Sequence, residues 1–173
     1  MLQPAIKYSE QLKNKLRDTW FIEKYKYYHI NGYYDELQIN NDTWNKHQFV
    51  SVYNDEVIGY IFYNIDRRSN FVYGLGIINF SDNKIVFGMD LGQALKDIFE
   101  KYKFRKLRFS VVIGNPIEKS YDKMIKKYNG RIVGIYKKET LLIDGKYYDE
   151  KLYEITREEY LKSVGYNECK KSE

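Results

Sequence analysis

The sequence predicts an α/β fold (of the α+β kind) in which helices flank a central, mixed but mostly antiparallel sheet. Three strand-like segments follow one another between residues 49 and 80, with a good hairpin turn after the first. A helical pattern then separates two apolar strand patterns, which predicts a right-handed strand–helix–strand crossover. With 173 residues, the chain is long enough to bury a core as one domain.

The N-terminal part combines one helix with a loop. Apolar residues recur at helical spacing from Leu12 to Trp20, so we expect a helix over residues 9–28 with Ser9 as its N-cap. Residues 31–48 are rich in Asn and Asp and are expected to form a loop with at most one short helix.

The remaining elements follow from apolar spacing and turn residues. Strands are expected at residues 49–53, 57–65, 71–80, 107–113, 131–142 and 147–156. Helices are expected at residues 90–102 and 116–128, and Asn129-Gly130 ends the second one. Asp144-Gly145 is a strong hairpin signal between the last two strands. Residues 1–173 are expected to form a single domain whose tail frays from about residue 164.

Composition and charge narrow the function classes. The sequence contains neither an apolar run of the roughly 20 residues that span a membrane nor a signal-peptide core at its start, so a cytoplasmic protein is expected. Cys169 is the single cysteine, and His29 and His47 match no metal-ligand spacing, so no disulfide and no metal are expected. The net charge of +5 is modest and scattered, which suits an anionic small ligand or a weak attraction to nucleic acid, but the basic residues form no cluster.

A glycine-bearing segment lies between the third strand and the next helix. Residues 88–94 read Gly-Met-Asp-Leu-Gly-Gln-Ala and are expected to form a turn that opens the helix. Such a turn points backbone N–H groups at one spot, which is how many proteins hold phosphates. A structural alternative stays open, because Asp90 and Gln93 also fit an N-cap and N3 pair.

The order of these elements resembles the GCN5-related N-acetyltransferase (GNAT) family over roughly residues 49–160. The C-terminal part resembles the ribosomal-protein N-acetyltransferase branch through residues 128–134, the turn Asp144-Gly145-Lys146 and residues 147–150. The resemblance implies a GNAT-like acyl-CoA N-acyltransferase fold that binds acetyl-CoA as co-substrate where two central strands separate. It also implies direct attack by a primary amine of a protein, a peptide or a small molecule.

The same resemblance implies which residues hold acetyl-CoA. The pantetheine arm would bond to the exposed backbone of residues 77–79. The family's pyrophosphate pattern, Gln/Arg-x-x-Gly-x-Gly/Ala, maps onto residues 89–94, where Gly92 and Ala94 match and Met89 departs from it. The implied cofactor-binding set is Ile77, Ile78, Asn79, Gly88, Met89, Leu91, Gly92, Gln93, Ala94 and Asn115.

The start of the last predicted helix contains candidates for a cofactor contact and for the acid of acetyl transfer. Asn115, with Pro116 at N1 and Glu118 at N3, is expected to cap this helix, and the resemblance implies that it also contacts the cofactor. The resemblance also implies that a tyrosine early in this helix protonates the leaving sulfur, which makes Tyr121, six residues beyond Asn115, the candidate catalytic acid, although a core aromatic explains the same residue. The central strand carries no carboxylate, so the base is left unassigned among Asp66, Glu139 and Asp149.

The acceptor side of the cleft would be formed by Tyr27-Tyr28, Tyr33-Tyr34 and the final hairpin, in a monomer or homodimer without a membrane partner. Two alternatives stay open. A degenerate, non-catalytic interaction module is supported by Met89, Asp90 and the central strand without a carboxylate. A nucleic-acid-binding domain is supported by the basic balance and by tyrosines that could stack on bases.

Overall fold

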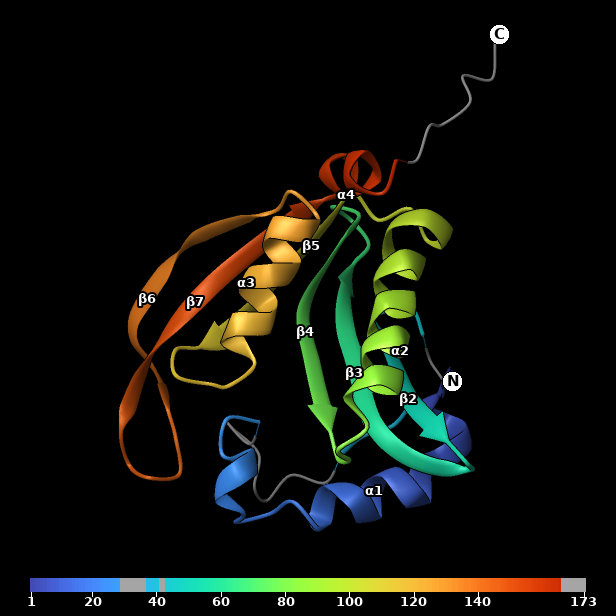
Figure 1. Cartoon of the computed structure of the whole chain (residues 1–173), viewed down its shortest axis with the longest axis vertical. Coiled ribbons are helices and arrows are strands. Elements are labelled where there is room, and N and C mark those ends of the chain that lie inside the picture. Colours follow the sequence, from blue (N-terminus) through green and yellow to red (C-terminus); the bar gives the residue numbers. More distant parts are fainter. Residues whose placement is uncertain (29–36, 41–42, 166–173) are drawn as a thin grey trace, which may run out of the picture.

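A seven-stranded sheet forms the centre of the part that the computed structural model describes, residues 1–28, 37–40 and 43–165 (Figure 1). The strands lie in the order β1-β2-β3-β4-β5-β7-β6, and neighbours pair antiparallel except β4 with β5. The strands are β1 (Leu2–Pro4), β2 (Lys46–Tyr53), β3 (Glu56–Asp66), β4 (Phe71–Asn79), β5 (Lys106–Val112), β6 (Arg131–Leu141) and β7 (Tyr147–Thr156). The predicted mixed, mostly antiparallel sheet is confirmed.

Helices cover both faces of this sheet. They are α1 (Ser9–Arg17), α2 (Lys84–Lys96), α3 (Glu118–Lys127) and α4 (Arg157–Ser163), with short helical segments η1 (Ala5–Tyr8), η2 (Glu23–Tyr25) and η3 (Asp97–Lys101). On one face, Leu12 and Leu16 of α1 join Tyr60 and Ile78 in a buried cluster. On the other face, α2 and α3 lie on either side of β4 and pack with α4 on the larger core (Figure 1).

The predicted turns between antiparallel strands are confirmed. Asn54 and Asp55 have φ values of 50° and 61°, so both occupy the left-handed region that a two-residue type I′ hairpin requires. Gly145, in the turn between β6 and β7, has a φ of 73°. After α3, Asn129 rather than Gly130 is the left-handed residue, with a φ of 55°.

The first predicted helix is too long. It ends at Arg17 instead of continuing to residue 28, and its N-cap is Tyr8 rather than Ser9. The hydroxyl of Thr19 donates to the Leu16 carbonyl at 2.6 Å, and Phe21 has a φ of 59°, so the chain leaves the helical path there. The sequence patterns also missed β1 and α4.

The predicted start of the second helix is wrong. α2 begins at Lys84 rather than Asp90, because Asn83 caps it by accepting from the Val86 N–H at 3.2 Å. Phe87, in the first turn, is buried in the larger core. This packing outweighs the low helix propensity of Gly88, which the sequence reading took as the sign of a turn.

Candidate active site

β4 and β5 separate after a short parallel contact. Their registered pairs end at Tyr73 and Arg108. β4 then continues to Asn79 and β5 to Val112 without pairing with each other (Figure 1). The two strands therefore form a fork, and the backbone groups along its inner edges need partners from outside the sheet.

Alternation along the β3–β4 ladder decides which backbone groups of β4 face this fork. The Phe80 N–H donates to the Ile58 carbonyl at 2.9 Å, and the register makes Ile78 the next β4 residue bonded to β3. Ile77 and Asn79 therefore direct their backbone groups toward the fork. The structure corrects the prediction for Ile78, whose backbone groups are directed to β3 and not to the fork.

The glycine-bearing segment lies inside α2, not in a turn. Its amides come after the first helical turn, so they donate along the helix. The expectation that the backbone of residues 88–94 forms a phosphate-binding loop is therefore wrong. The end of the helix that attracts an anion is its start, residues 84–87, which follows the end of β4 by a few residues. The N–H groups of Lys84 and Val86 already donate there to the Asp82 carbonyl and the Asn83 side chain, so this attraction rests on the helix dipole. Lys84 adds an exposed cation there.

The predicted cofactor residues on α2 divide between two faces of the helix. Gly88, Met89 and Gly92 lie on the outer face, where Met89 is 71% exposed and a Cβ added at either glycine would meet no atom within 4 Å. Ala94 is only 1% exposed, and Leu91 packs against the same core. Burial contradicts a cofactor contact for Ala94, whereas contacts for the residues on the outer face stay a prediction.

Asp90 is a buried structural carboxylate. It accepts a hydrogen bond from the Ser51 hydroxyl at 2.5 Å and lies 3.2 Å from the Met1 ammonium. Gln93 donates instead to Asp97 at 2.7 Å. The expected N-cap and N3 pair is wrong, because Asn83 caps α2 and Asp90 bonds to groups outside the helix.

Tyr121, on α3, packs beside the fork. Its ring meets the rings of Phe109 and Tyr153 edge-on, with centroids 5.0 Å and 6.0 Å away. Phe109 is the first β5 residue beyond the last pair with β4. Tyr121 is 4% exposed, and burial raises the pKa of its phenol above the ordinary value of 10.0. Its hydroxyl has no hydrogen-bond partner within the described part of the chain, which is costly for a buried polar group.

The predicted start of α3 is wrong by two residues, since the helix begins at Glu118 and its N-cap is Ile117 rather than Asn115. The Asn115 side chain accepts from the Ile117 N–H at 3.1 Å, and Glu118 accepts from the Gly114 N–H at 3.1 Å. Lys151 of β7 bonds to Glu118 and holds the pKa of that carboxyl below its ordinary value. Asn115 therefore serves the local fold, and its contact with a cofactor stays a prediction.

One of the aromatic segments expected on the acceptor side reaches the final hairpin. The Tyr27 and Tyr148 rings lie edge-to-face with centroids 6.3 Å apart, and the Lys26 Nζ is 3.8 Å from Asp144. The segment before β2 and the hairpin of β6 and β7 thus meet on this side of the molecule. Tyr33-Tyr34, His29 and Cys169 lie outside the described residues.

The carboxylates named as possible bases are engaged elsewhere or exposed. Asp66 accepts from the Ser69 N–H at 2.9 Å in the turn after β3. Asp149 lies 2.8 Å from the Lys137 ammonium. Glu139 is exposed on β6. A different carboxylate, Glu150 of β7, is bonded to β5 beside the fork, and the alternation of the predicted strand over residues 147–156 could have indicated it.

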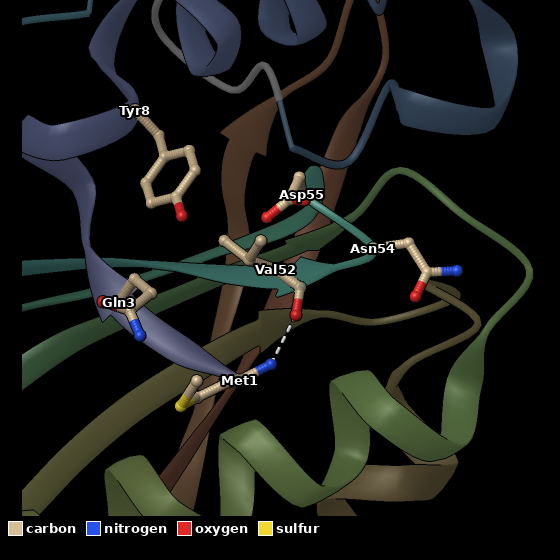
Figure 2. Close-up of a pocket in the computed structure, with 6 residues that line it drawn as sticks. All are labelled: Met1, Gln3, Tyr8, Val52, Asn54 and Asp55. Carbon is tan, nitrogen blue, oxygen red and sulfur yellow. Dashed lines mark hydrogen bonds between the residues drawn. The ribbon is translucent and has the colours of Figure 1, made fainter.

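A surface pocket lies away from the fork, at the β1–β2 edge (Figure 2). It is lined by Met1, Gln3, Tyr8, Val52, Asn54 and Asp55. None of the predicted site residues lines this pocket, and β3 lies between β2 and β4 in the sheet. Within the described ranges, no group of three or more His, Cys, Asp or Glu is placed to hold a metal ion, and no described helix combines the length and apolar character of a membrane span.

Solved structures of acetyltransferases share this fold. A presumed acetyltransferase aligns with a TM-score of 0.58 at 18% identity, over 73% of this chain and 64% of its own length, which is less than two thirds. The spermidine/spermine N-acetyltransferase SpeG from Vibrio cholerae, in complex with manganese ions, aligns with a TM-score of 0.58 at 20% identity over 69% of this chain and 70% of its own. A point mutant of that SpeG gives a TM-score of 0.59 at 19% identity, over 70% and 72%.

No family model matches the sequence, and no curated protein matches it either. At the identities of the structural matches, the likeness shows the fold. It is the acetyltransferase fold that the sequence resemblance implied.

Proposed function

We propose that this protein is an N-acetyltransferase, which transfers an acetyl group from acetyl-CoA to a primary amine by direct attack. The observation that carries the proposal is the fork between β4 and β5, where unpaired backbone edges begin beside Phe109, whose ring contacts the ring of Tyr121, and the buried Tyr121 hydroxyl has no partner among the described residues. The acetyltransferases that share the fold support the class of reaction. The proposal includes a cytoplasmic location and a monomer or a homodimer.

The groups around the fork suit acetyl-CoA. The backbone groups of Ile77 and Asn79 can pair with the amides of an extended pantetheine arm, as a neighbouring strand would. The first turn of α2 combines a positive helix end with Lys84, which suits a diphosphate. When bound, acetyl-CoA supplies an activated acetyl thioester.

The chain supplies an acid for the leaving group. The acceptor nitrogen attacks the thioester carbon, the C–N bond forms as the C–S bond breaks, and the Tyr121 phenol donates its proton to the sulfur. Because burial raises its pKa, Tyr121 is protonated at neutral pH and acts as an acid rather than as a base. The attacking amine must first lose a proton to water, since an alkylammonium has a pKa of about 10, and the second proton that leaves the nitrogen as the amide forms passes through water to restore the Tyr121 phenol.

Calorimetric titration with acetyl-CoA tests the proposal, with ATP and desulfo-CoA as controls. We expect micromolar binding of acetyl-CoA and much weaker binding of ATP. Lys84→Glu should weaken acetyl-CoA binding by about tenfold, since it reverses a charge beside the proposed diphosphate site. Lys96→Glu, at the other end of the same helix, makes the same change in net charge and should leave the affinity unchanged.

Absence of acetyl-CoA binding in the folded protein would refute the proposal. The fold would then serve as a non-catalytic interaction module. Equal affinities of the two lysine variants would instead refute only the placement of the diphosphate at the start of α2.

A further inference from the structure

Glu150 lies on the face of the fork opposite α3. Its neighbour Lys151 bonds to Glu118 and Asp122 of α3, and successive residues of a strand point to opposite faces. Glu150 is half-buried and stands opposite Val112 in the β5–β7 register. Val112 belongs to the part of β5 that has already separated from β4. The carboxylate is therefore one strand away from the open side of the fork.

Only two hydroxyl groups bond to this carboxylate within the described residues. Ser110 of β5 donates to Oε1 at 2.5 Å, and Thr140 of β6 donates to Oε2 at 3.5 Å. A carboxylate offers about four acceptor positions, so Glu150 retains acceptor capacity. The two hydroxyl groups also hold the carboxylate in a defined orientation.

The nearby cations of the described chain are engaged with other groups. Lys151 points to the opposite face, and Lys137 pairs with Asp149 at 2.8 Å. The guanidinium of Arg108 lies 4.2 Å from the centroid of the Phe71 ring. No ion pair of Glu150 is present among the residues that the structure describes.

Glu154, on the same face of the same strand, is a carboxylate that this sheet compensates with cations. It pairs with Lys106 at 2.7 Å and with Arg131. Burial works against ionisation of Glu154, but these two cations lower its pKa overall. Glu154, which lies where β4 and β5 are still paired, therefore has two cations. Glu150, which lies where the two strands have separated, has none among the described residues.

Aromatic side chains flank Glu150 on its face. Tyr148 lies two residues earlier on β7, and Tyr136 stands opposite Glu150 in the β6–β7 register. Tyr136 is 53% exposed. Aromatic rings beside a carboxylate offer both cation–π attraction and apolar surface to an alkylammonium group.

We infer that Glu150 binds the ammonium group of the acceptor, and that the acceptor is a positively charged primary alkylamine. The inference rests on the proposed function and adds the recognition residue and the substrate class. The amine enters from the face that carries Glu150, while α2 and α3 cover the other face of the fork. The Glu150 carboxylate, which has no ion pair among the described residues, thus supplies the negative charge that selects the acceptor.

Spermidine is the probe, titrated by calorimetry into protein saturated with desulfo-CoA. Glu150→Gln keeps the shape of the side chain and removes its charge, so we expect spermidine affinity to fall at least tenfold. Glu150→Asp keeps the charge and should lose less affinity. Glu158→Gln, on exposed α4, changes the net charge equally and should bind spermidine as the wild type does. Acetyl-CoA should bind all four proteins with the same affinity.

Two outcomes would overturn the inference while leaving the proposed function intact. One is equal spermidine affinity in Glu150→Gln and the wild type. The other is a wild type that binds acetyl-CoA but not spermidine. Failure of the wild type to bind acetyl-CoA would overturn the proposed function itself. Thermal unfolding of each variant checks that a lost affinity does not result from unfolding.

Discussion

Removing one oxygen atom from Tyr121 separates its catalytic role from its packing role. Tyr121→Phe keeps the ring that packs against Phe109 and Tyr153 and deletes the hydroxyl. The residue is 4% exposed, and the hydroxyl has no partner among the described residues. A buried polar group without a partner costs roughly 1–3 kcal/mol, so we expect the free energy of unfolding to rise by about 1 kcal/mol. For a chain of this size, that corresponds to a rise in Tm of about 2–4 °C.

The same substitution should slow acetyl transfer. General acid catalysis contributes on the order of 100-fold or more, so we expect kcat to fall by about that factor. Acetyl-CoA affinity should stay within about twofold, because the ring contacts remain. The assays are urea unfolding for stability, release of the CoA thiol for turnover and calorimetry for affinity.

Tyr153→Phe is the matched comparison. The Tyr153 hydroxyl donates to Asp122 at 2.8 Å, so its removal should lower stability by about 1 kcal/mol, opposite in sign to Tyr121→Phe. A loss of stability in Tyr121→Phe would refute the reasoning that its hydroxyl is unpartnered. An unchanged kcat would leave Tyr121 as a core aromatic without a catalytic role.

Two further predictions concern the fold. Gly92→Ala should stabilise the protein by about 1 kcal/mol in urea unfolding, because a Cβ there meets no atom within 4 Å and alanine favours the helix interior. Gly130→Ala should destabilise it, since its Cβ would lie 2.7 Å from the Glu154 carbonyl oxygen; the opposite order would contradict this packing. Burial lowers the pKa of His47 below 6.5, so its stabilising contribution is present above pH 6.5 and is lost as the pH falls through the lower folded value. Urea unfolding at several pH values should therefore show a smaller loss of stability toward acid in His47→Gln than in the wild type, and equal losses would exclude His47 as the cause.

The sequence patterns predicted the sheet well because strand signals are local. Alternating apolar residues and turn residues such as Asn54-Asp55 specify β2, β3, β4 and the final hairpin without reference to distant contacts. The start of α2 was predicted wrongly for the opposite reason. Gly88 signals a turn locally, but Phe87 is buried against distant strands, and this packing extends the helix back to Lys84.

By itself, the sequence determined the mixed sheet and the crossover from β4 to β5, which follow from residue types at short spacings, whereas the candidacy of Tyr121 came from the family resemblance. Only the tertiary structure decided where β4 and β5 separate, because the register between two strands depends on everything packed around them. It also showed that Asp90 accepts from Ser51 and lies 3.2 Å from the Met1 ammonium, and that Glu150 has no cation among the described residues, since such partners lie far apart in the chain. For that reason, strand alternation could assign Glu150 to a face of the sheet, but reading along the chain could not show how its charge is compensated.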